Sequence, residues 1–373
     1  MSTPEPSEDV GQRLFFVIGA PRSGTTLLMR MLNAHPDIHT RPEPHLLTPL
    51  AHLGYYGHVD AASYDPFQAA MSVKQLVRDL PGGESTYLQA LRAYTDTLYG
   101  TLLAEADTRY FVDKTPAYAL VLPFIARLYP NARYVVLTRH PFAIFSSFAK
   151  SFFDDDWEAA HAHNPLLERY VPAIARFLRA APVAHVHVSY EAMVSDPEAH
   201  LQRICAHADM PFDASMIEYG QTKMETQGLG DPIGVDADSR PNTKSLDKWA
   251  LQVKGNAKRI DLLKSMVDRI FDEDLETFGY TRESLWTPLE TVDVEAAEKA
   301  QKAAKKWDSY HVQRRMLVTL RKNIHGNILG DTLEKVRFYS DVLLRDTWTD
   351  TVDQVAELDS PGSDDADQTG DSA

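Results

Sequence analysis

A glycine-rich segment near the start of the chain has the composition of a loop that holds phosphate groups. It reads Gly19-Ala-Pro-Arg-Ser-Gly24-Thr25-Thr26, with its two glycines five residues apart. The apolar run before it, residues 14–18, is typical of a strand buried on both faces, and residues 25–34 after it have the apolar spacing of a helix. Backbone N–H groups in such a loop and at the helix N-terminus carry partial positive charge. The segment therefore predicts a site for an anion.

The loop differs from that of nucleoside triphosphatases at one position. Thr25 stands where those enzymes place the Lys that reaches the terminal phosphates. Arg22, inside the loop, offers several donors to a phosphate or to a group in transfer. Hydrolysis of ATP or GTP is therefore disfavoured, and a P-loop nucleotide kinase or triphosphatase is kept as the alternative enzyme.

A second anion-binding element is predicted after residues 133–138, which read as a strand that ends at Arg139. A helix is expected from Pro141 to about residue 152, because proline is favoured in the first turn. Ser147 lies two turns into that helix, where it can approach the same phosphate as Arg139.

Strands and helices alternate along this part of the chain. Further strands are expected at residues 109–112 and 184–188, and further helices at 118–128 and 196–207. This alternation predicts an α/β fold with a parallel sheet flanked by helices, and such folds bind ligands at the carboxyl ends of the strands.

The loop and the Arg139 segment together resemble the sulfotransferases that use 3′-phosphoadenylyl sulfate (PAPS). The resemblance extends over roughly residues 14–280 and implies a nucleotide-kinase-like (P-loop NTPase-like) core. It implies that the loop holds the 5′-phosphosulfate end of PAPS and that Arg139 and Ser147 hold the 3′-phosphate. The nucleotide-binding residues implied in these two segments are Arg22, Ser23, Gly24, Thr25, Thr26, Arg139 and Ser147.

Three later segments are similar to other elements of that family. Asp113-Lys114-Thr115-Pro116 resembles a Lys-Thr-Pro segment of bacterial sulfotransferases, and the resemblance implies that Lys114, like Arg22, neutralises charge on the leaving group. Tyr190-Glu191 is similar to a Tyr-Glu-Asp element, and residues 242–249 are similar to a nucleotide-covering loop that ends in Trp. Tyr190, Lys244 and Ser245 are therefore implied as nucleotide-binding residues.

Two residues are candidates for the general base. Glu43 lies 21 residues after Arg22, a spacing similar to that of tyrosylprotein sulfotransferases, in which a Glu in that place is the base. His45 is the alternative, because histidine titrates closest to neutral pH. Glu43-Pro-His-Leu-Leu47 and residues 139–143 are also similar to sulfotransferase domains of polyketide assembly lines. A solvated loop carboxylate is the other interpretation of Glu43.

The resemblance implies a bacterial enzyme that moves a sulfuryl group in line from PAPS to a hydroxyl, or an amine, without a metal. PAPS would leave as adenosine 3′,5′-bisphosphate (PAP), and the expected acceptor is a small molecule or metabolite. A noncatalytic partner-binding protein on the same fold is the third hypothesis. The presence of Arg22, Lys114 and Glu43 argues against it.

Composition limits the partners. A net charge of −15 disfavours binding to nucleic acid or to anionic lipid. The single cysteine, Cys205, excludes an intramolecular disulfide and fits a reducing cytoplasm. No run of 18 apolar residues is present, so no membrane-spanning helix is expected.

Four regions are expected along the chain: a disordered N-terminus (residues 1–12), a sulfotransferase domain (13–288), a helical extension (289–350) and an acidic disordered tail (351–373). Eight of the carboxylates lie within residues 350–373, which contain no Lys or Arg, and such a segment cannot bury enough apolar surface to fold. The oligomeric state is left open.

Overall fold

The computed structural model describes residues 10–40, 43, 47, 50, 66–221 and 239–293. The chain divides into two units, Met1–Trp307 and Asp308–Ala373, and every described residue belongs to the first. Most of the expected helical extension and all of the acidic tail lie outside the described residues. Within the expected N-terminal tail, Val10 begins a short 3-10 helix, η1 (Val10–Arg13).

The centre of the fold is a five-stranded parallel sheet with the order β2-β3-β1-β4-β5. Its strands are β1 (Leu14–Gly19), β2 (Ile38–Thr40), β3 (Tyr110–Asp113), β4 (Arg133–Thr138) and β5 (His185–Ser189). β1 lies in the middle and is buried along its whole length, as its continuous apolar sequence predicts. The predicted fold class, a parallel sheet flanked by helices with the glycine loop after the central strand, is confirmed.

Side chains of β1 alternate between two apolar layers because successive residues of a strand point to opposite faces. Leu14, Phe16 and Ile18 pack into one layer, and Phe15 and Val17 pack into the other. The first layer includes residues of α4 (Glu84–Ala106), α5 (Leu122–Leu128), α6 (Pro141–Phe153) and α8 (Leu166–Ala180). The second includes residues of α1 (Thr25–Asn33), α9 (Tyr190–Ser195) and α10 (Pro197–His207).

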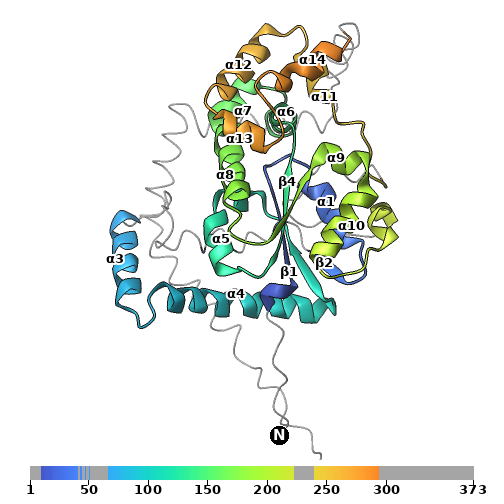
Figure 1. Ribbon diagram of the computed structural model, residues 1–373. Coiled ribbons are helices and arrows are strands. Elements are labelled where there is room, and N and C mark those ends of the chain that lie inside the picture. Colours follow the sequence, from blue (N-terminus) through green and yellow to red (C-terminus); the bar gives the residue numbers. More distant parts are fainter. Residues whose placement is uncertain are drawn as a thin grey trace, which may run out of the picture. The chain divides into compact units, whose positions relative to one another are not determined.

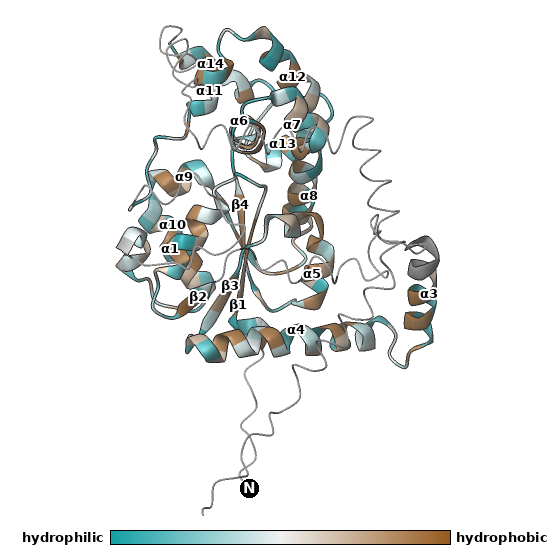
Figure 2. Ribbon diagram, turned by 180° about the vertical axis from the view of Figure 1, so that it is seen from behind, coloured by the Kyte–Doolittle hydropathy of each residue, from teal (hydrophilic) through white to brown (hydrophobic). Residues whose placement is uncertain are grey.

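The two ends of the sheet differ. α4 crosses the end at which the strands begin, and α6 and α9 start at the end at which β4 and β5 finish (Figure 1). The central strands and the sheet-facing parts of the helices are coloured as hydrophobic in Figure 2. The other helices are α3 (Pro66–Asp79), α7 (Trp157–His163), α11 (Lys248–Val253), α12 (Ala257–Val267), α13 (Asp272–Thr277) and α14 (Thr287–Thr291). Across the described ranges, no helix is both long enough and apolar enough to cross a bilayer.

One predicted helix, residues 118–128, is wrong as a single element. The structure has the 3-10 helix η2 (Pro116–Leu120) and then α5, with Val121 between them. Pro123 explains the break, because it has no N–H to continue a helix from η2 and its ring clashes with the preceding turn. η2 becomes important below because it places Tyr118 beside the candidate site.

Candidate active site

All five strands are parallel and end at one edge of the sheet, and the site residues follow four of them, β1, β3, β4 and β5. Gly19 pairs with Leu137 and Thr138 pairs with Ser189, so β1, β4 and β5 end at nearly the same level. β3 ends deeper, since its last residue, Asp113, pairs with Phe16. The predicted site residues that follow these strand ends are Arg22, Lys114, Arg139 and Tyr190.

The glycine loop requires glycine at its second glycine position. Gly24 has φ 100°, and a Cβ there would lie 2.3 Å from Cδ2 of Tyr190. Arg22 also has a positive φ, 71°. α1 begins at Thr25 with no side-chain cap, so the N–H groups of its first turn face the loop without a side-chain acceptor from Gly24. This geometry suits close approach of an anion to backbone N–H groups.

Arg139 connects three of the segments. Its Nη1 donates to the carbonyl oxygen of Arg22 at 2.8 Å, and its Nη2 donates to the carbonyl oxygen of Ser245 at 3.2 Å. The guanidinium lies 4.2 Å from the centre of the Tyr190 ring, and the Tyr190 hydroxyl is 2.6 Å from Ser245 Oγ. Burial lowers the pKa of Arg139, and the Tyr190 and Glu191 side chains oppose this shift. The Arg139 segment and the glycine loop therefore form one site.

Ser147 joins the same cluster through Arg22. The Arg22 Nε donates to Ser147 Oγ at 3.0 Å. The neighbouring Ser146 is buried and donates to Gln252 Oε1 at 2.5 Å, in a different direction. The structure therefore brings Ser147, rather than Ser146, to the loop.

Lys114 and Glu43 form an ion pair beside the N-terminus of α1. The Lys114 Nζ contacts the Glu43 carboxylate and lies 3.5 Å from Thr26 Oγ1. The Lys114 side chain is 1% exposed and that of Glu43 is 16% exposed, so the cation is fully buried and the carboxylate is partly accessible to solvent. A carboxylate and a cation thus meet beside the glycine loop.

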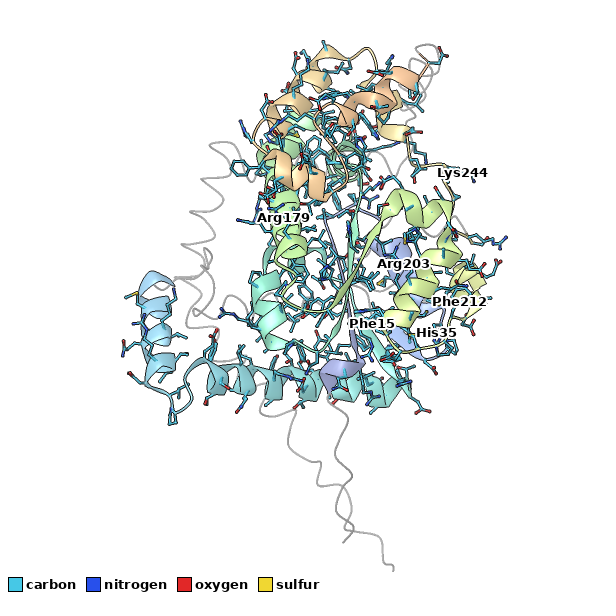
Figure 3. All side chains as sticks on the ribbon, viewed as in Figure 1. Phe15, His35, Arg179, Arg203, Phe212 and Lys244 are labelled. Carbon is cyan, nitrogen blue, oxygen red and sulfur yellow. The ribbon has the colours of Figure 1, made fainter. Side chains whose placement is uncertain are left out.

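The remaining predicted residues fall into four groups. Ser23 and Thr25 are buried in the loop, and Ser245 contacts Arg139 as described above. Lys244 is exposed on the segment before α11 (Figure 3), and its backbone N–H donates to Asn242 Oδ1 at 3.1 Å. His45 lies outside the described residues.

A buried aromatic cluster supports the start of α6, and the sequence analysis did not identify it. The His140 ring stacks on Trp249 at 4.7 Å and its Nδ1 accepts from the Phe142 N–H at 3.2 Å, while the His140 N–H donates to Glu191 Oε1 at 2.9 Å. Burial lowers the pKa of His140 to about 3, so the ring is neutral at physiological pH. Both Glu191 and Trp249 fall in segments noted for their resemblance, but nothing in the sequence connected them to His140.

Comparison with known proteins identifies the family. The model of the sulfotransferase family matches residues 15–214, which is more than half of the chain. The chain belongs to the sulfotransferase family. The prediction of a sulfotransferase, made from the loop and strand-end motifs, is therefore confirmed at the level of the family, and the nucleotide-kinase alternative is set aside.

Two relatives with similar sequences illustrate the range of proteins that this sulfotransferase resembles. Nodulation protein NoeE of Sinorhizobium fredii is 31% identical over 224 residues, which are 59% of this chain and 51% of NoeE. Protein-tyrosine sulfotransferase 1 of Mus musculus is 30% identical over 129 residues, which are 34% of this chain and 31% of that protein. The match thus covers about half the length of NoeE and about a third of the length of the mouse enzyme.

One solved structure to which the chain is similar is also a sulfotransferase domain by its name. The sulfotransferase domain of the Synechococcus PCC 7002 olefin synthase is 25% identical, with a TM-score of 0.47, and the match covers 72% of this chain and 94% of that domain.

Proposed function

We propose that this sulfotransferase moves a sulfuryl group from PAPS to a hydroxyl, or an amine, of an acceptor. The observation that carries the proposal is the junction of Arg139, Arg22 and Ser147, in which cationic groups from two strand ends meet at one glycine loop. A nucleotide with phosphate on both sides of its ribose needs such a pair of anion sites side by side. Lys114 and Glu43, beside Thr26 at the start of α1, supply a third cation and a candidate base.

Two buried donors support the fit of a nucleotide bisphosphate. Ser23 Oγ and Arg139 Nε are buried and have no hydrogen-bond partner among the described residues. A buried polar group without a partner costs about 1–3 kcal/mol, so such groups are usually satisfied by protein, water or ligand. Both atoms belong to segments that the resemblance assigns to phosphate binding. We infer that Ser23, Gly24, Thr25 and Thr26 hold the 5′ side of PAPS, and that Arg139 and Ser147 hold its 3′-phosphate.

When bound, PAPS would supply the sulfuryl group, whose bond to the phosphate oxygen breaks as its bond to the acceptor oxygen forms. Arg22 and Lys114 stabilise the negative charge that develops on the departing phosphate oxygen, as fixed cations do best in an enclosed site. Because these side chains provide the charge compensation themselves, we propose that the transfer needs no metal ion.

Glu43 is the proposed general base. Its carboxylate would accept the proton of the acceptor hydroxyl, and a base must lie within hydrogen-bond reach of that proton. Support comes from its contact with Lys114, which lies beside Thr26 of the loop, and from the partial exposure of its side chain. His45 is the alternative base, and both residues are compared in the experiment below.

The proposed acceptor is a small molecule or metabolite in the cytoplasm of a bacterium. Tyr190 and Ser245 are proposed to contact the nucleotide from the covering side, and Lys244 is the most exposed member of the proposed binding set. We propose no nucleic-acid partner, given the net charge of −15.

Calorimetry with PAP and a transfer assay with labelled PAPS would test the proposal. We expect PAP to bind in the presence of EDTA, and we expect label to reach at least one compound in a panel of hydroxyl and amine acceptors that includes tyrosyl peptides. If PAP does not bind, or if binding requires magnesium, the proposal is wrong. Label found only on tyrosyl peptides would overturn the small-molecule acceptor and leave the reaction intact.

The base is tested by Glu43→Gln beside His45→Asn. We expect Glu43→Gln to keep its affinity for PAP and to lose about 100-fold or more in kcat, in line with the effect of general bases. The matched control is Glu198→Gln, which removes an exposed carboxylate on α10 and should change neither quantity. Full activity of Glu43→Gln, with a loss in His45→Asn, would transfer the role to His45.

A further inference from the structure

The hydroxyl of Tyr118 links two segments that carry the proposed base and the proposed cation. Tyr118 lies in η2 and is fully buried. Its oxygen accepts a hydrogen bond from the Leu47 N–H at 3.0 Å and donates one to Asp113 Oδ2 at 2.9 Å. Leu47 is four residues after Glu43, and Asp113 directly precedes Lys114. One hydroxyl therefore joins the segment of Glu43 to the strand end that presents Lys114.

The carboxylate of Asp113 is a buried anchor for this link. It accepts hydrogen bonds from the hydroxyls of Tyr99 at 2.6 Å, Tyr118 at 2.9 Å and Thr115 at 3.1 Å. Burial raises the pKa of Tyr118, and the Asp113 charge raises it further, so the phenol keeps its proton and acts as the donor. A buried carboxylate is tolerated when several donors satisfy it, and these donors fix its position.

The described contacts join the two segments at two points. Tyr118 joins Leu47 to Asp113, and the ion pair joins Glu43 to Lys114, the residue that follows Asp113. If either segment moves relative to the other, a buried hydrogen bond or the ion pair must break. The placement of the Glu43 carboxylate relative to the Lys114 ammonium is therefore restrained by both contacts.

We propose that Tyr118 is a positioning residue, whose hydroxyl sets the placement of Glu43 relative to Lys114 for sulfuryl transfer. The inference rests on the proposed function, because the relative placement of the two groups affects a rate only if both act on the same acceptor. In this proposal Tyr118 contacts neither PAPS nor the acceptor of the sulfuryl group. Its removal should lower the rate of transfer without changing nucleotide binding, since misplacement of a catalytic group by about 1 Å can cost about 100-fold in rate.

The test compares Tyr118→Phe with Tyr99→Phe in the full chain. Both substitutions remove a buried phenol hydroxyl that donates to Asp113, and both keep the aromatic ring, but Tyr99 lies on α4 and has no hydrogen bond to Leu47 among the described residues. We expect Tyr118→Phe to lower kcat about 100-fold, with the PAP dissociation constant and the KM for PAPS within about 2-fold of wild type. Tyr99→Phe should change kcat by less than about 5-fold. Equal losses in both variants, or an unchanged kcat in Tyr118→Phe, would overturn the proposal.

Hydrogen exchange at the Leu47 amide provides a readout that does not depend on activity. We expect exchange to be about 10-fold faster or more in Tyr118→Phe and unchanged in Tyr99→Phe, because only the first variant removes the acceptor of that amide. If wild type binds PAP but transfers no sulfuryl group, the proposed function fails while the exchange result still decides whether the link exists. If Tyr118→Phe does not fold, the wild-type amide decides: an exchange rate equal to that of an unstructured peptide would refute the link.

Discussion

Replacing Gly24 by Ala tests the geometry of the glycine loop most directly. Gly24 has φ 100°, and a Cβ there would lie 2.3 Å from Cδ2 and 2.7 Å from Cε2 of Tyr190. Ordinary carbon–carbon contacts are about 3.5–4.0 Å, so the Tyr190 ring would have to move by more than about 1 Å. That ring supports the Arg139 guanidinium from 4.2 Å and its hydroxyl is 2.6 Å from Ser245 Oγ, so the movement would disturb both contacts.

The expected loss follows from these contacts. The left-handed backbone costs an Ala about 1–2 kcal/mol. Loss of the cation–π contact adds about 0.5–2 kcal/mol, and loss of the Tyr190 hydrogen bond adds about 0.5–1.5 kcal/mol. The free energy of unfolding should therefore fall by about 2–5 kcal/mol, which corresponds to a decrease in Tm of about 5–15 °C for a domain of this size. PAP affinity should fall at least about 10-fold, because the same movement displaces Arg139.

Gly100→Ala is the matched control, because it makes the same change to the unfolded chain at a position where the folded chain has room for a Cβ. Gly100 lies within α4, and a Cβ there would meet no atom within 4 Å. Ala in a helix is about 0.5–1 kcal/mol more stable than Gly, partly because it restricts the unfolded state, so this variant should unfold at a slightly higher temperature. Calorimetric melting and PAP titration of both variants would decide the matter. A Gly24→Ala protein as stable as wild type, with unchanged PAP affinity, would refute the reasoning.

Three further predictions concern charged and titrating groups. Arg22→Ala should lower the rate of sulfuryl transfer about 100-fold or more by removing a fixed cation at the loop, and near-normal turnover of labelled PAPS would remove Arg22 from that role. Arg139→Ala should weaken PAP about 10- to 100-fold in calorimetry, whereas Arg133→Ala, at the opposite end of β4, should not; equal effects would argue against a phosphate contact at Arg139. His140 has a pKa depressed to about 3, so the unfolded state binds the extra proton below about pH 6.5 and stability falls as the pH drops from there toward 3. Between about pH 7 and pH 5, the free energy of unfolding measured in urea should fall by about 2 kcal/mol less for His140→Asn than for wild type. Parallel curves of this free energy against pH would contradict the prediction.

Sequence reasoning located most of the strand ends because their signals are local. The continuous apolar run of β1, the glycines after it and the proline at the start of α6 each act within a few residues, and the structure has β1, α1, β4 and α6 within one residue or so of the predicted limits. The break between η2 and α5 also had a local signal, Pro123, which the prediction of one helix overlooked. β2 has only three residues and exists because it pairs with β3, a partner about 70 residues away. Periodicity in a short window cannot detect such an element.

The residues of the candidate site also differ in whether a local sequence signal could identify them. Parallel strands force their carboxyl ends to one edge, so once Arg22, Arg139 and Lys114 had been placed after strands, topology alone brought them together. The hydroxyl of Tyr118 has no comparable signal: its partners Leu47 and Asp113 lie 71 residues before it and 5 residues before it, and no pattern of residue types links a backbone N–H to a distant phenol. Residues that recognise charge were therefore predictable from strand ends, whereas a residue that fixes the distance between two of them could be identified only from the packed structure.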